Sequence, residues 1–281
     1  MIKVLKTKTD LQLELGKLKK NGLKVGLIPT MGALHDGHLS LIHLAKKQTD
    51  IIVCSIFVNP TQFTNAEDLK KYPRTLESDV EMLEQAGTDL VFAPEIEEMY
   101  EDDEKWYFEL ADLDTIMEGK FRIGHFQGVT QIVYKLFLLV KPDIAFFGQK
   151  DFQQFAVIQK MVEDFHMDLK LVCAPTIRDE RGLALSSRNS RLSKFEKEKA
   201  TILSKALFYF KAQKGKGDFT DSLHHAIKLI EKTQDVKLEY FEVRDTGTLK
   251  KAADWNSYPK LVVCVAAKFG SIRLLDNVII E

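Results

Sequence analysis

Short apolar runs alternate with longer amphipathic stretches through the first two-thirds of the chain. The runs have the length of buried strands, and they lie at 25–30, 51–58, 89–93, 143–147 and 169–174. Apolar positions at helical spacing predict helices over 37–48, 75–85, 127–140 and 151–165. This alternation is typical of a parallel sheet with crossover helices. We therefore expect an α/β domain over residues 1–176.

The pattern lapses between residues 177 and 191, where the chain is rich in Arg and Ser. We interpret this lapse as a domain junction. Beyond it, Ser193 and Glu196 have the spacing of a capping box and predict the start of a long helix. The helical and β-like runs that follow lie at 194–213, 220–232, 236–243, 259–267 and 271–280. Helices grouped before strands predict a smaller α+β domain over residues 177–281.

Charge and apolar runs exclude several classes of protein. Forty basic residues against 41 acidic ones give a formal net charge of −1, so no global field favours nucleic acid or an anionic membrane. Charges at Lys3 and Lys6 interrupt any signal peptide, and no apolar run is long enough to span a bilayer. We expect a cytoplasmic protein whose cysteines, Cys54, Cys173 and Cys264, are reduced packing residues.

The most informative segment is Pro-Thr-Met-Gly-Ala-Leu-His-Asp-Gly-His at 29–38, between the first predicted strand and its helix. Ligands of open α/β sheets bind at such turns, where a helix amino terminus favours anions. Gly32 and Gly37 have Walker A spacing, but His38 and Leu39 replace the Lys and Ser/Thr that this loop requires. The P-loop interpretation therefore fails on its functional residues.

His35 and His38 can both face one ligand and stabilise charge on a phosphoryl group. Two alternatives remain open, which are a metal-binding pair and a pair of helix caps. No third ligand stands at metal-binding spacing, so we predict no resident metal site.

Two further strand ends carry polar side chains. Asn59 and Gln62 follow one strand, and they could bind a small polar substrate or form an ordinary Asn-Pro turn. Phe-Gly-Gln-Lys-Asp-Phe-Gln-Gln at 147–154 follows another. There Lys150 could bind phosphate, and Asp151 could cap the helix or accept from a ribose hydroxyl.

The last cluster is Arg-Asp-Glu-Arg-Gly-Leu-Ala-Leu-Ser-Ser-Arg-Asn at 178–189. Its hydroxyls and the guanidinium of Arg188 suit phosphoryl oxygens. A solvated charged linker would have a similar composition, and by itself the segment favours that interpretation.

Together these segments resemble the pantothenate synthetase family, also called pantoate–β-alanine ligases. The resemblance includes Phe-Val-Asn-Pro-x-Gln-Phe at 57–63, Tyr-Pro-Arg at 72–74 and Gly-His-Phe-x-Gly-Val at 124–129. Six motifs in one order make it specific, although the last 80 or so residues add little.

The resemblance implies a Rossmann-like nucleotidyltransferase domain with a smaller carboxyl-terminal lid. It implies a cytosolic homodimer of coenzyme A biosynthesis, with ATP as substrate and Mg²⁺ assisting. Pantoate would attack the α-phosphorus of ATP and release pyrophosphate, and β-alanine would then displace AMP from the pantoyl-adenylate.

The family's functional positions can be carried onto matching residues. The ATP site would be lined by Met31, Gly32, Ala33, Leu34, His35, Asp36, Gly37, His38, Gly148, Gln149, Lys150, Asp151, Ile177, Leu185, Ser186, Ser187 and Arg188. His38 would be the proton donor, with His35, Lys150 and Arg188 as further catalytic groups. Gln62 and Gln154 would hold pantoate, with Asn59 and Tyr72 nearby.

Three positions depart from the family pattern, namely Ile123, Leu138 and Arg181. Two other functions compete with the ligase. A related nucleotidyltransferase could use the same histidines on another acceptor, but the two glutamines favour a small hydroxy acid. An idle nucleotide sensor is disfavoured because the histidines, Lys150 and Arg188 are intact.

Overall fold

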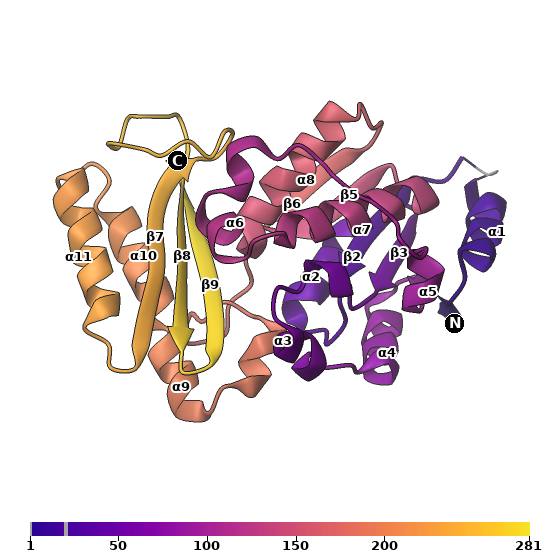
Figure 1. Cartoon of the computed structure of the whole chain (residues 1–281), viewed down its shortest axis with the longest axis horizontal. Helices are drawn as coiled ribbons and strands as arrows, with labels where there is room; N and C mark the ends of the chain where they lie inside the picture. The colour runs from indigo at the N-terminus through magenta and orange to yellow at the C-terminus, as the bar shows by residue number, and fades with distance from the viewer. Residues whose placement is uncertain (1, 20–21) are drawn as a thin grey trace. The chain divides into compact units, whose positions relative to one another are not determined.

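The computed structural model describes residues 2–19 and 22–281, which form two compact units (Figure 1). Unit 1 contains the chain up to Gly148 together with Val157–Pro175. Unit 2 contains Gln149–Ala156 and Thr176–Glu281. The short segment Gln149–Ala156 therefore groups with the carboxyl-terminal part of the chain, although the strand before it belongs to unit 1.

Unit 1 is built on a six-stranded parallel sheet in the order β1-β4-β3-β2-β5-β6. Its strands are β1 (Lys3–Leu5), β2 (Val25–Thr30), β3 (Ile51–Ile56), β4 (Leu90–Phe92), β5 (Ile144–Gly148) and β6 (Lys170–Ala174). The expected parallel α/β sheet is confirmed. The expectation that 25–30 is the first strand is wrong, because Lys3–Leu5 pairs with β4 at the sheet edge. Three residues are too few to give a periodic signal.

The helices of unit 1 include those predicted from the alternation, whereas the 12-residue helix α1 and several short helices were not predicted. They are α1 (Lys8–Lys19), α2 (Asp36–Ala45), η1 (Pro60–Gln62), α3 (Ala66–Lys71), α4 (Leu76–Ala86), α5 (Ile96–Met99), η2 (Ala111–Asp114), α6 (Met117–Phe121) and α7 (His125–Val140). A further helix, α8 (Phe152–Asp164), begins in unit 2 and continues into unit 1.

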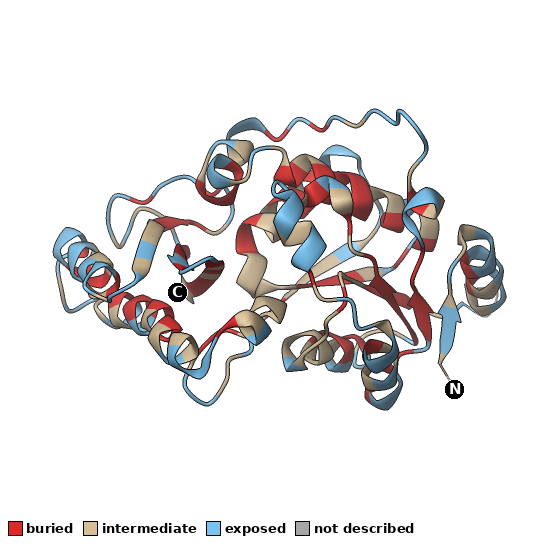
Figure 2. Ribbon diagram, turned by 60° about the horizontal axis from the view of Figure 1, so that its bottom comes forward, coloured by how far each residue is buried: buried red, intermediate tan, exposed pale blue. Residues whose placement is uncertain are grey.

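One apolar cluster of unit 1 lies between the sheet and helices α2 and α4. Sheet residues Ile28, Ile52 and Cys54 pack there with Ile42 of α2 and Leu83 of α4. Figure 2 shows β3 and β4 in the buried colour along their length. Sheet residues buried on both faces explain why these strands read as continuous apolar runs.

The register of the sheet decides which turns lie together. Thr30 at the end of β2 pairs with Ile56 at the end of β3. The turn after β2 and the turn after β3 therefore leave the same edge side by side. From β2 the sheet continues through β3 on one side and β5 on the other, which makes this edge a topological switch point of the kind that binds ligands.

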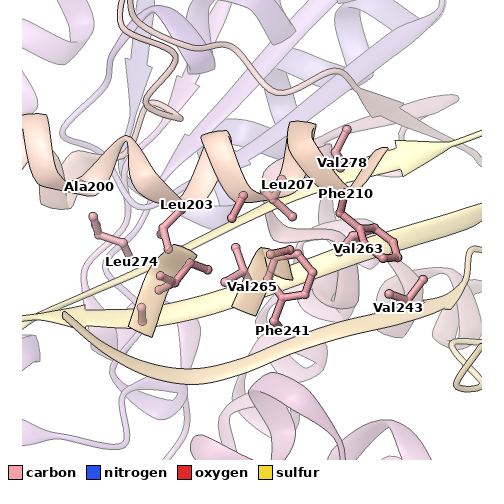
Figure 3. Packing of buried hydrophobic residues seen from close by; sticks show 14 of the residues in the cluster. Ala200, Leu203, Leu207, Phe210, Phe241, Val243, Val263, Val265, Leu274 and Val278 are labelled. Carbon is pink, nitrogen blue, oxygen red and sulfur yellow. The ribbon is translucent and has the colours of Figure 1, made fainter. Parts of the chain in front are cut away.

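Unit 2 is a small α+β body with an antiparallel sheet in the order β7-β8-β9. Its elements are η3 (Gln149–Asp151), η4 (Ser187–Arg191), α9 (Lys194–Ala200), α10 (Ile202–Ala212), α11 (Phe219–Glu231), β7 (Val236–Asp245), β8 (Leu261–Phe269) and β9 (Ile272–Ile280). In Figure 3, Leu207 and Phe210 of α10 lie against Val263 and Phe241 of the sheet.

The predicted long helix at 194–213 is divided in two. The capping box of Ser193 and Glu196 is confirmed at the start of α9. The division falls at Thr201, whose hydroxyl donates to the carbonyl oxygen of Glu198 at 2.7 Å. Such side-chain bonds compete with the helical ladder, and helical periodicity alone does not reveal them.

Cys54, Cys173 and Cys264 form no disulfide bond. Cys54 and Cys264 are buried, as expected, and Cys173 is partly buried. Burial raises the pKa of Cys54 to about 12 and that of Cys173 to about 11. These two thiols are protonated at neutral pH and serve as packing groups.

Candidate active site

The turn after β2 carries the histidine segment at the carboxyl edge of the sheet. Gly32 and Ala33 both have positive φ, +77° and +50°, which reverse the chain before α2 begins at Asp36. A Cβ on Gly32 would stand 2.9 Å from a carboxylate oxygen of Asp79. Glycine is therefore required here both for its backbone conformation and for close approach.

Asp79 holds this turn, and its role was not predicted from the sequence. The side chain comes from α4, is 2% exposed, and accepts from the amides of Ala33 at 2.9 Å and Leu34 at 2.8 Å. The Thr75 hydroxyl donates to the same carboxylate at 3.2 Å. An acidic residue near a helix start is ordinary, so no local signal distinguishes Asp79 from its exposed neighbour Glu77.

The two histidines do act as helix caps. His35 is the N-cap of α2, and its Nδ1 accepts from the amide of Gly37 at 3.1 Å. The Nδ1 of His38 accepts from the amide of His35 at 3.3 Å, and the ring centroids are 4.1 Å apart. Because each Nδ1 accepts, a neutral ring carries its proton on Nε2. Capping therefore orients both imidazoles as Nε2–H donors.

A buried amide cluster stands at the end of β3. Asn59 is 1% exposed, and its Nδ2 donates to the carbonyl of Gly128 at 3.0 Å and to Oε1 of Gln62 at 3.1 Å. Its Oδ1 accepts from the Tyr100 hydroxyl at 2.6 Å. The Gly128 carbonyl can only accept, so it fixes the amide of Asn59 and, through it, that of Gln62. The Nε2 of Gln62 then lies 3.2 Å from the sulfur of Met31.

Asn59 also caps η1, so the Asn-Pro turn and the polar cluster are one structure. Gly128 of α7 makes the close packing possible. A Cβ there would lie 2.4 Å from the backbone of Thr61 and 2.5 Å from the amide nitrogen of Gln62. Tyr72 is buried with its ring 5.6 Å from that of Phe63, the residue after Gln62.

His125 and Arg122 hold the main chain of Gln62. The Nδ1–H of His125 donates to the Gln62 carbonyl at 2.8 Å, and Arg122 donates to Nε2 of His125 at 2.9 Å. A carbonyl only accepts and a guanidinium only donates, so His125 is neutral with its proton on Nδ1. The Gly-His-Phe motif marked this position, but no role for His125 was predicted from it.

Unit 2 carries the second set of candidate residues. A pocket there brings Lys150 and Ser186 together, and it is lined by Lys150, Leu183, Ala184, Ser186, Asn189, Leu203, Leu274, Leu275 and Asp276. The Lys150 ammonium stands 3.6 Å from the carboxylate of Asp151. The Oδ1 of Asn189 is buried without a hydrogen-bond partner among the described residues. The pocket is therefore lined by a cation and a hydroxyl.

The segment 177–191 is a packed loop, and the solvated-linker interpretation is wrong. Leu183 and Ala184 are buried, and Arg178 forms a bidentate ion pair with Asp276 at 2.5 and 2.8 Å. The main-chain amide of Leu185 donates to the Ile177 carbonyl at 3.0 Å. Composition could not reveal this, because the partner carboxylate lies about a hundred residues further along the chain.

The remaining candidates are distributed between the units. Ser186 caps η4 by accepting from the amide of Arg188 at 3.3 Å, and Ser187 and Arg188 are half-buried in that turn. Gln154 is half-buried on α8 in unit 2, whereas Gln62 belongs to unit 1. Each unit thus contains some of the candidate site residues, and in each unit they lie near a cluster of polar side chains.

The three departures from the family pattern lie on the surface. Ile123 is 85% exposed and Leu138 is 50% exposed. The Arg181 guanidinium pairs with Asp179 at 3.6 Å and is half exposed.

Among residues 2–19 and 22–281, no group of three His, Cys, Asp or Glu side chains is placed to hold a metal ion. Within the same residues, no helix has the length and apolar character needed to cross a membrane.

The parallel sheet, with a histidine-bearing turn at its switch point, defines the class of protein as a Rossmann-like α/β fold, and this turn is its candidate ligand site. The family model for pantoate–β-alanine ligase matches residues 3–279. The chain belongs to this family.

Individual members of the family are similar to this chain over nearly its whole length. Pantothenate synthetase of Bacteroides fragilis is 48% identical over 277 residues, which cover 99% of this chain and 98% of that protein. The crystal structure of pantothenate synthetase from Thermus thermophilus has a TM-score of 0.93 at 38% identity, covering 99% of both chains. The ligase from Francisella tularensis, whose structure is described as complexed with β-γ ATP and β-alanine, has a TM-score of 0.81 at 32% identity, with 99% and 97% covered.

Proposed function

We propose that this chain, as a pantoate–β-alanine ligase, works through a pantoyl-adenylate. The pantoate carboxylate forms a bond to the α-phosphorus of ATP, and pyrophosphate leaves. The amine of β-alanine then attacks the acyl carbon, and AMP leaves as the amide forms. A carboxylate is inert toward an amine, so it must first be activated, and adenylation supplies AMP as the leaving group.

The carrying observation is the contact between Gln62 and Met31 in unit 1. The Gln62 amide is held with its N–H group toward the turn that bears the histidines. An acid bound by Gln62 would therefore have its carboxylate next to a nucleotide phosphate bound at that turn. Adjacent binding of the two reactants converts a bimolecular step into an effectively unimolecular one.

We assign the phosphate contacts of unit 1 to residues 31–38. Main-chain amides at the α2 amino terminus favour an anion, and the Nε2–H groups of His35 and His38 can donate to phosphoryl oxygens. In this assignment His38 donates a hydrogen bond through Nε2–H, and before it could give up that proton the ring would have to be protonated at Nδ1, in place of the bond from the His35 amide. Its effect is largest when negative charge builds up on the departing pyrophosphate.

We assign the polyphosphate clamp of unit 2 to Lys150 with Ser186, Ser187 and Arg188. Lys150 and Ser186 both line the pocket of unit 2, so the two groups of the proposed clamp are neighbours in the fold. Gly148–Asp151, Ile177 through its main chain, and Leu185 would complete the nucleotide site. Gln62 would hold pantoate and also reach toward β-alanine, with Asn59 orienting its amide. The resemblance assigns Gln154 to pantoate as well.

ATP would enter as its Mg²⁺ complex. Mg²⁺ in such sites is held by substrate phosphates and waters with one or two carboxylates, and a dedicated protein cage is not needed. Asp151 places a carboxylate beside Lys150 in the proposed clamp. We further propose a cytoplasmic homodimer, which sedimentation of the purified protein would test by a mass twice that of the chain.

The adenylation proposal is tested by following AMP and pyrophosphate release from ATP and Mg²⁺. We expect pyrophosphate release to require pantoate, and AMP release to require β-alanine as well. AMP turnover indifferent to both substrates would contradict the proposal. Turnover with another acid, and none with pantoate, would instead favour a related nucleotidyltransferase.

A further inference from the structure

Asn277 of β9 is bound to the turn that carries Lys150. Its Nδ2 donates to the carbonyl oxygens of Gln149 and Lys150, both at 2.8 Å. Its Oδ1 accepts from Nε2 of Gln149 at 3.0 Å. One side chain thus makes three hydrogen bonds to two consecutive residues of η3.

The position of Asn277 is unusual for an amide. It is 2% exposed, and it stands in β9 directly before Val278, which belongs to the apolar core of unit 2. Asn is a poor strand former, and a buried amide is costly unless its hydrogen bonds are satisfied. Packing alone would favour an apolar residue, so the bonds to η3 explain why an amide is present.

A second interaction links the same strand to the loop that carries Ser186. Asp276 is 3% exposed and forms the bidentate ion pair with Arg178. Arg178 also donates to the carbonyls of Gly182 at 3.1 Å and Asn277 at 3.2 Å. Burial raises the pKa of Asp276, and the guanidinium opposes that shift. Neighbouring residues of β9 therefore fix both sides of the pocket that contains Lys150 and Ser186.

From these contacts we infer that Asn277 is a positioning residue for Lys150. By tying the Gln149 and Lys150 carbonyls to β9, it fixes where the ammonium stands relative to the Ser186 hydroxyl. The ligand of this pair would be the polyphosphate of a nucleotide, so the inference rests on the proposed function. It also explains why Gln149–Ala156 groups with unit 2 although β5 ends in unit 1 at Gly148.

The test is a double-mutant cycle between Asn277→Asp and Lys150→Ala, read as kcat and kcat/KM for ATP-dependent AMP release. The Asp side chain has the same shape and keeps the acceptor for Gln149, but it places a carboxylate oxygen against two carbonyls. We expect Asn277→Asp to lower kcat by at least about tenfold in the natural protein. In the Lys150→Ala background it should change the rate less than about twofold, since the group it positions is gone.

Asn256→Asp is the matched control, because Asn256 is an exposed residue of the same unit and undergoes the same chemical change. Its rate should stay within about twofold of the natural protein. If Asn277 had a structural role only, Asn277→Asp would lower the rate by the same factor with Lys150 present and with Lys150→Ala. This result would overturn the inference. An Asn277→Asp protein with unchanged kcat would overturn it as well.

Two further measurements keep the test decisive. If Asn277→Asp does not fold, the cycle is run with Asn277→Ser, which retains one donor. If the natural protein releases no AMP with pantoate and β-alanine, the proposed function fails separately. In that case the hold of Asn277 on η3 is measured without substrate, by hydrogen exchange of the main-chain amides at 149–152. Faster exchange in Asn277→Asp than in Asn256→Asp supports it, and equal exchange rejects it.

Discussion

The carboxylate of Asp79 accepts a hydrogen bond from the main-chain amide of Leu34 at 2.8 Å, although α4 and the turn after β2 are far apart in sequence. A second oxygen accepts from Ala33. These bonds satisfy two amides of a turn with two consecutive positive φ angles, so Asp79 compensates for backbone strain at the proposed phosphate site.

Replacing Asp79 by Asn should lower both stability and rate. The amide keeps one acceptor but turns an NH₂ group toward a main-chain N–H, so we expect a loss of about 1–3 kcal/mol in the free energy of unfolding. Urea denaturation measures this loss, and a rise in KM for ATP should accompany it. Glu77→Gln, an exposed charge removal on the same helix, should stay within about 0.5 kcal/mol. Equal stability of the two variants would refute the role of Asp79.

His38→Ala should reduce the rate of AMP release by roughly a hundredfold or more, because one preorganised donor is commonly worth about 3–4 kcal/mol at a transition state. His43→Ala is the control, since His43 is an exposed residue of the same helix. Its rate should match that of the natural protein. Full activity of His38→Ala would spare the ligase assignment and remove the proposed role of His38.

Gly128→Ala and Gly16→Ala should have opposite effects on stability. The new Cβ at residue 128 would meet the backbone of η1 at 2.4 Å, so η1 must shift and take Gln62 with it. We expect a loss of about 1–3 kcal/mol and a higher KM for pantoate. Gly16 is an exposed position of α1 with open space around it, and Ala should add about 0.5–1 kcal/mol there. Thermal unfolding compares them directly, and a stabilised Gly128→Ala protein would contradict the packing described above.

Tyr100→Phe should weaken pantoate binding independently of pH over the working range. Burial raises the pKa of Tyr100 from 10.0 to about 12. The bond from its hydroxyl to Asn59 thus contributes fully below the unfolded pKa, and it is lost only as pH rises through the folded value. Removing this bond should cost about 0.5–1.5 kcal/mol in the free energy of pantoate binding. The KM for pantoate should then exceed that of the natural protein by the same factor at every pH from about 6 to 9. A difference from the natural protein that vanishes within this interval would point to another titrating group.

The hydrophobic pattern was sufficient to predict most of the architecture. Runs such as 51–58 are buried on both faces, and this burial is why they predicted parallel strands. The three-residue strand β1 was missed because its pairing with β4 comes from the tertiary fold. The helix division at Thr201 was missed because the helical pattern of apolar residues continues through it, and the hydroxyl bond to Glu198 leaves no signal in that pattern.

The sequence by itself also located the turns to which we assign chemistry, since glycines, histidines and amides gather there at strand ends. Their supporting contacts were decided only by the tertiary structure. Asp79 is one acidic residue among several on its helix, and Asn277 lies in a strand whose sequence carries no recognisable motif. Each acquires its role from a partner distant in sequence, through hydrogen bonds that exist only once sheet register and strand order have brought the two segments together.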